Sequence, residues 1–107
     1  MQFSDRVLME LWNILGGEEV RPKNFTMNNA RKFFYDACEK YSEAEKCVLK
    51  VVPHGNGFEI TQVMLNKDDD MIKTGNGFCV GRKIFAEQVD KSVWNFLDGK
   101  EWRIMEG

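Results

Sequence analysis

The spacing of apolar residues changes at Cys47, and this change constrains the fold more than any other feature of the sequence. Before Cys47 apolar residues recur at helical spacing, whereas after it they alternate, which places successive side chains on opposite faces of a strand. Residues 47–52 and 58–65 both alternate, and the His-Gly-Asn-Gly sequence at 54–57 between them has the composition of a tight turn. We therefore expect an antiparallel hairpin, with Pro53 ending its first strand.

Three segments carry apolar residues three and four positions apart, which is the pattern of an amphipathic helix. This pattern predicts helices over residues 5–15, from Thr26 or Asn28 to Tyr41, and over about residues 85–97. Glycines just after the first and third segments provide left-handed exits from those helices. The second segment has the clearest apolar stripe, formed by Ala30, Phe33, Phe34, Ala37, Cys38 and Tyr41.

The rest of the chain completes the expected fold. The Gly-Asn-Gly sequence at 75–77, flanked by residues 71–74 and 78–80, is typical of a second, shorter hairpin, and residues 102–105 could form a final strand. The order of elements predicts an α+β fold, an antiparallel meander of three to five strands with three helices packed mainly on one face. Because no long linker interrupts the chain, residues 1–107 are expected to form one domain.

Charge and hydropathy exclude several classes of function. The 15 Lys and Arg residues and 17 Asp and Glu residues give a formal net charge of −2, spread evenly over both halves of the chain. This balance argues against a dedicated nucleic-acid-binding protein, which needs clustered cations to neutralise phosphates. No run of about eighteen apolar residues is present, and the acidic N-terminal region lacks the features of a secretory signal. We expect a cytoplasmic protein that does not bind membranes.

Cysteine and histidine usage gives little support for catalysis or metal binding. Cys38, Cys47 and Cys79 match no metal-binding or redox spacing, so we expect free thiols, no metal site and no cofactor. A Cys/His enzyme would need His54, the single histidine, to meet Cys79 at the tips of the two predicted hairpins. The acidic run at 68–70 lacks the ligand spacing of a calcium loop. We therefore predict no catalytic residues.

One segment has the composition of an anion site. Gly75, Asn76 and Gly77 could form a nest of backbone N–H groups, and Arg82 and Lys83 follow closely with two positive charges. The glycine spacing differs from the dinucleotide-binding and P-loop motifs. A hairpin turn beside a solvated basic pair is the alternative interpretation. If the segment binds a ligand, we expect an anionic small molecule such as a nucleotide.

Aromatic residues and methionines are abundant, with 3 Trp, 8 Phe, 2 Tyr and 6 Met in 107 residues. Such side chains dominate recognition surfaces as well as cores. Several of them lie off the predicted core stripes or at their edges, and we consider these candidates for a contact surface. They are Phe3, Met9, Met27, Met71, Trp94 and Trp102, to which Trp12 is added on the first predicted helix.

These observations favour a non-enzymatic binding protein that occupies or inhibits a macromolecular partner, most simply another protein, and that could also self-associate. At the level of class, the chain is similar to the small accessory proteins that phages and other mobile elements encode against host factors. Two alternatives stay open. The first is a protein that sequesters an anionic ligand at residues 75–83, and the second is a Cys/His enzyme.

Overall fold

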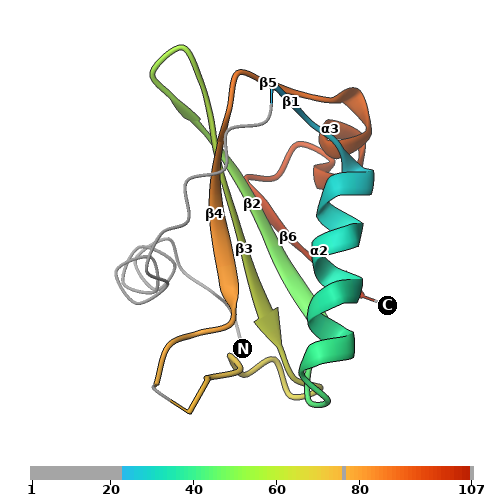
Figure 1. The fold of residues 1–107 in the computed structure, drawn as a ribbon. Helices are drawn as coiled ribbons and strands as arrows, with labels where there is room; N and C mark the ends of the chain where they lie inside the picture. The colour runs from blue at the N-terminus through green and yellow to red at the C-terminus, as the bar shows by residue number, and fades with distance from the viewer. Residues whose placement is uncertain (1–22, 76, 107) are drawn as a thin grey trace.

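The computed structural model describes residues 23–75 and 77–106 (Figure 1). The predicted helix over residues 5–15 lies outside the described residues. Neither described helix is long and apolar enough to cross a membrane. In chain order the elements are β1 (Asn24–Phe25), α2 (Met27–Lys40), β2 (Lys46–His54), β3 (Gly57–Leu65), β4 (Gly81–Ala86), β5 (Gln88–Val89), α3 (Lys91–Leu97) and β6 (Trp102–Glu106).

The main sheet has four antiparallel strands in the order β4-β3-β2-β6. The predicted hairpin is confirmed, because β2 and β3 pair from Lys46 opposite Leu65 to His54 opposite Gly57. The prediction that Pro53 ends the first strand is wrong. Val51 donates its N–H to Glu101 on the β6 side, so the nitrogen of Pro53 faces the same side beyond the end of β6. The missing N–H therefore removes no hydrogen bond to β3.

The predicted second hairpin is present in part, as isolated bridges rather than strands. Lys73 bridges Cys79 across the turn, with hydrogen bonds from Thr74 to Phe78 and from Val80 to Ile72, and Met71 bridges back to Leu65. The next strand of the meander is β4, which pairs with β3 as far as Ala86 opposite Phe58. The predicted helix over 85–97 is therefore wrong at its start, because pairing with β3 draws residues 85 and 86 into the sheet. Helix α3 begins only at Lys91.

Both described helices pack on the same face of the sheet, as expected. Helix α2 lies along the sheet and α3 near one end of it (Figure 1). They share one core cluster with the inward side chains of all four strands. Its fully buried members include Phe34 of α2, Leu49, Ile60 and Val93. The α+β class and the antiparallel sheet are thus confirmed.

Side chains and a small parallel ladder fix the ends of the helices. Thr26 is the N-cap of α2, and its Oγ1 accepts the N–H of Asn29 at 3.1 Å. Strand β1 pairs in parallel with β5, Asn24 opposite Gln88, an arrangement that the sequence pattern did not predict. This ladder joins the start of α2 to the chain that leads into α3.

Asp90 caps α3 and should make the helix sensitive to acid. Its Oδ2 accepts the N–H of Ser92 at 3.0 Å and its hydroxyl at 2.6 Å, and these bonds hold the pKa of Asp90 below its usual 3.8. The cap therefore stabilises the fold above pH 3.8 and is lost as the pH falls through the lower folded-state pKa. In urea unfolding, Asp90→Ala should be less stable than wild type at neutral pH, and this difference should shrink below pH 3.8. A difference independent of pH would contradict the assignment.

Candidate functional site

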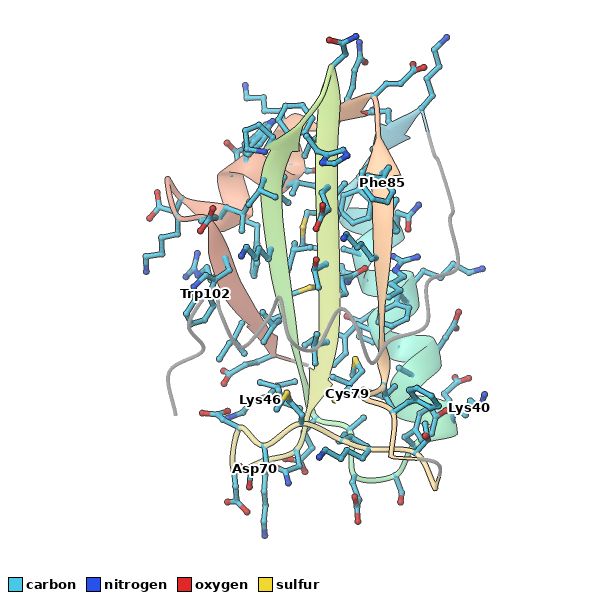
Figure 2. The ribbon with its side chains drawn as sticks, turned by 90° about the vertical axis from the view of Figure 1, so that its left-hand side faces the viewer. Lys40, Lys46, Asp70, Cys79, Phe85 and Trp102 are labelled. Carbon is cyan, nitrogen blue, oxygen red and sulfur yellow. The ribbon has the colours of Figure 1, made fainter. Side chains whose placement is uncertain are left out.

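A groove lies between the C-terminal half of α2 and residues 74–81, with a volume of about 540 Å³. Lys40 of α2 and Cys79 of the facing segment lie at the same end of the sheet (Figure 2). The residues that line the groove are Phe33, Asp36, Ala37, Lys40 and Tyr41 on one wall and Thr74, Phe78, Cys79, Val80 and Gly81 on the other. The groove is therefore built from the predicted second helix and the second Gly-Asn-Gly turn.

The helical repeat explains the first wall. Steps of three or four residues lead from position 33 to 36 and 37, and from 37 to 40 and 41, so these positions fall on one side of α2. Ala37 is buried, whereas Phe33 and Tyr41 are only partly buried and pack at the edge of the core. The predicted stripe therefore has two parts. Phe34 is buried in the core, whereas Phe33 and Tyr41 line the groove.

The turn at 74–78 explains the second wall. Thr74 donates its N–H to the carbonyl of Phe78 at 2.7 Å, and its Oγ1 accepts the N–H of Phe78 at 3.3 Å. Gly77 donates to the carbonyl of Thr74 at 2.9 Å and has a φ of +82°, which glycine adopts at little cost. These contacts fix a turn that presents Phe78 with 48% of its surface exposed.

The lining combines aromatic rings with one acid and one base. Asp36 and Lys40 are one helical turn apart, and neither forms an ion pair within the described part of the chain. The Nζ of Lys40 lies 5.5 Å from the centroid of the Tyr41 ring. The groove can therefore take apolar groups against its rings and polar groups along its rim.

Arg82 belongs to a polar network between α2 and the sheet. Its Nε donates to Oε1 of the fully buried Gln62 at 2.8 Å, and its Nη2 donates to the backbone carbonyl (3.1 Å) and to Oδ1 (2.8 Å) of Asn29. The guanidinium carbon lies 4.5 Å from the centroid of the Phe33 ring. Burial lowers the pKa of Arg82 to about 10, so it stays charged at neutral pH.

The structure does not bring the predicted anion-binding residues together. Lys83 is on the opposite face of the sheet from Arg82, and its Nζ lies 3.1 Å from Oε1 of Glu59. Gly75 and Gly77 belong to the turn beside the groove, and Asn76 lies outside the described residues. Of the five candidates, only the two glycines are placed next to the groove.

The candidate contact residues are also dispersed. Met27 is buried in the core, and Met71 and Trp102 pack in a second cluster, on the face of the sheet away from the helices. Trp94 is exposed on α3, where its ring meets Phe58 edge-on at 5.3 Å. The remaining candidates, Phe3, Met9 and Trp12, lie outside the described residues. The described candidates therefore form no single patch.

The structure keeps His54 and Cys79 apart. The ring of His54 packs 4.9 Å from that of Phe85, and Figure 2 shows Phe85 and Cys79 at opposite ends of the sheet. The three cysteines are free, and burial raises the pKa of Cys47 to about 12 and also raises that of Cys79. In the acidic run, Asp69 pairs with Lys46 at 2.7 Å. Residues 23–75 and 77–106 contain no group of three potential metal ligands.

Sequence reasoning missed most of the groove, because Phe33 and Tyr41 were assigned to the core and Phe78 to a strand. The width of the helical stripe was one available signal, since side chains at 33 and 34 point about 100° apart around the helix, so Phe33 falls at the margin of a stripe that has Phe34 in the core. No family model matches the chain, and no curated protein or solved structure is similar enough to match it. Its function is therefore inferred from the geometry of its own residues.

Proposed function

We propose that this protein is a non-catalytic binding protein that holds a partner protein through the groove between α2 and residues 74–81. The observation that carries the proposal is Phe78, an aromatic ring almost half exposed on a turn that three hydrogen bonds fix. Exposed rings held in place lose little conformational entropy on binding and commonly supply much of the affinity of an interface.

The size and lining of the groove support a protein segment as the ligand. A volume of about 540 Å³ lies within the range of established ligand sites, roughly 300–1,000 Å³, and could take more than one apolar side chain. The rings of Phe33, Tyr41 and Phe78 would contact those side chains, and Asp36 and Lys40 would face polar groups of the same segment. An apolar centre with a charged rim is the usual arrangement of a protein interface.

Such a protein acts by occupying its partner. This mode of action fits the accessory proteins by which phages and mobile elements block or redirect a host factor, although that parallel is an analogy of class. A second copy of the chain could also supply the bound segment, and light scattering of the purified protein would reveal self-association. In that event Phe78→Ala should shift the protein toward the monomer.

Replacing Phe78 with alanine should weaken partner binding about 30-fold, the effect of losing a hot-spot residue worth about 2 kcal/mol. The partner is first captured from a native-host extract by wild-type protein and identified by mass spectrometry. The Kd values of the purified variants are then measured by calorimetry. Because Phe78 is exposed, the variant should keep its thermal stability.

Tyr35→Ala is the matched control, because Tyr35 is 54% exposed on α2 and does not line the groove. It should bind with the wild-type Kd. The groove would be excluded as the site if Phe78→Ala kept the wild-type Kd, or if both variants lost the same affinity.

The alternative, an anionic ligand at residues 75–83, has one observation in its favour. Arg82 donates its hydrogen bonds to neutral oxygens of Gln62 and Asn29, so among the described residues no carboxylate neutralises its charge. This alternative predicts that ATP or inorganic phosphate raises the Tm. If no nucleotide in a panel and no phosphate changed the Tm, an anionic ligand at residues 75–83 would be excluded.

A further inference from the structure

The wall of the groove opposite α2 contains main-chain groups that point away from the rest of the sheet. Cys79 lies opposite Lys73, and the hydrogen bonds of this bridge are made by the residues on either side of the two. These bonds run from the N–H of Val80 to Ile72 at 2.9 Å and from the N–H of Thr74 to Phe78 at 2.7 Å. In an antiparallel pair of this kind, the opposed residues do not bond to each other. The N–H and C=O of Cys79 therefore point out of the bridge.

Gly81 continues the same edge. Met64 of β3 donates its N–H to the carbonyl of Val80 at 2.9 Å, so the main-chain groups of Gly81, the next residue, point away from β3. Strand β4 is at the end of the four-stranded sheet. Among the described residues, no hydrogen bond reaches the main-chain N–H or C=O of Cys79 or Gly81. Because both residues line the groove, they offer it two donors and two acceptors.

The spacing of the opposite wall suits an extended chain. Phe33, Ala37 and Tyr41 are four residues apart on α2 and its C-cap, which places them about 6 Å apart along the helix axis. Every second side chain of a strand points the same way, and such side chains lie roughly 6.7 Å apart. Helix α2 lies along the sheet, so a strand added beside β4 would run along the helix (Figure 1). Its inward side chains would then match the positions on the helix.

A helical ligand would fit this wall less well. Its main-chain groups would be satisfied by its own hydrogen bonds, and those of Cys79 and Gly81 would stay unpaired. Cys79 is only 4% exposed, and an unpaired main-chain group at a buried residue destabilises the bound state. An extended segment supplies the missing donors and acceptors and also presents side chains to the rings.

We propose that the groove binds an extended segment of its partner, which adds as a short strand to the edge at Cys79 and Gly81. This inference rests on the function proposed above and specifies the form of the bound segment. Main-chain hydrogen bonds hold the segment in register, and every second side chain points to α2. The segment that fits has apolar residues at alternate positions, with a basic residue near Asp36 and an acidic residue near Lys40.

Amide hydrogen exchange measured by NMR tests the edge in the free protein. The N–H of Val80 is bonded to Ile72, whereas those of Cys79 and Gly81 have no partner among the described residues. Both should therefore exchange at least about ten-fold faster than the N–H of Val80. If the three amides exchanged at the same rate, the edge would already be closed and the proposal would be overturned.

Short peptides are the probe for the bound state. They are selected from a random display library on the wild-type protein and counter-selected on Phe78→Ala. Bound peptide should slow the exchange of Cys79 and Gly81 at least about ten-fold. The amide of Gly75, in the same segment but outside the proposed edge, is the matched control and should keep its rate. Methylating the main-chain nitrogens of the peptide one at a time should weaken binding about ten-fold or more, at alternate positions only.

The outcomes separate this inference from the proposed function. Peptides that bind wild type better than Phe78→Ala but leave the exchange of Cys79 and Gly81 unchanged would overturn the extended mode and support the groove as the site. Apolar residues three and four positions apart in those peptides would have the same meaning, because that spacing is helical. If no selected peptide distinguished wild type from Phe78→Ala, the proposed function would fail together with this inference.

Discussion

Arg82→Ala should lower the free energy of unfolding by about 3 kcal/mol, because it breaks the network that joins α2 to the sheet. Gln62 is fully buried, and its Oε1 would lose the Nε–H donor of Arg82. The backbone carbonyl of Asn29 and the ring of Phe33 would lose their contacts with the same guanidinium. A buried acceptor left without a donor costs more than the net value of the hydrogen bond. Urea denaturation measures the change.

The variant Arg82→Lys tests whether stability depends on the hydrogen-bond geometry of the guanidinium or only on its positive charge. An ammonium group keeps the positive charge but cannot donate to Gln62 and Asn29 in the forked geometry that Arg82 uses. We therefore expect Arg82→Lys to recover less than half of the stability that Arg82→Ala loses. If Arg82→Ala were as stable as wild type, the network would not hold the helix to the sheet. If Arg82→Lys were fully stable, charge alone would matter.

Arg82 also shows why the sequence could not place the two residues of a basic pair. Adjacent residues in a strand point to opposite faces, so Arg82 and Lys83 could converge on one ligand only if their segment were not a strand. Ile84, Phe85 and Val89 happen to have helical spacing, and this hid the alternation of β4. The partner strand β3, about twenty residues earlier in the chain, decides the conformation of β4. The spacing of apolar residues within one sequence carries no information about this tertiary contact.

Where local chemistry decides the structure, prediction from sequence succeeded. The hairpin at 46–65 follows from alternation and a turn of suitable composition, and α2 follows from its apolar stripe and the cap at Thr26. The groove could not be predicted in this way, because its two walls are more than thirty residues apart in the chain. The exposure of Phe78 depends on how residues 74–81 pack beside α2, which no local pattern specifies.

Gly57→Ala should lower the free energy of unfolding by about 2–3 kcal/mol, although glycine at this position has no positive φ. A Cβ at Gly57 would overlap the carbonyl oxygen of Ala86 and would lie 3.2 Å from both Ala86 C and Glu87 Cα. All three atoms are backbone, so no side-chain rotation relieves the overlap. The last pair of the β3–β4 ladder, Phe58 with Ala86, would have to separate. Thermal and urea unfolding measure the loss.

The second copy of the Gly-Asn-Gly-Phe sequence supplies the control. A Cβ at Gly75 meets no heavy atom within 4 Å and Gly75 has no positive φ, so Gly75→Ala should change stability by less than about 1 kcal/mol. Gly55→Ala should fall between the two, because Gly55 has open space around it but a φ of +57°, which costs roughly 1–2 kcal/mol for a residue with a Cβ. Equal losses at Gly57 and Gly75 would mean that the two turns share one role. The expected order of stability losses instead indicates two different roles. The first turn is a close-packed corner of the sheet, and the second supports Phe78 in the groove.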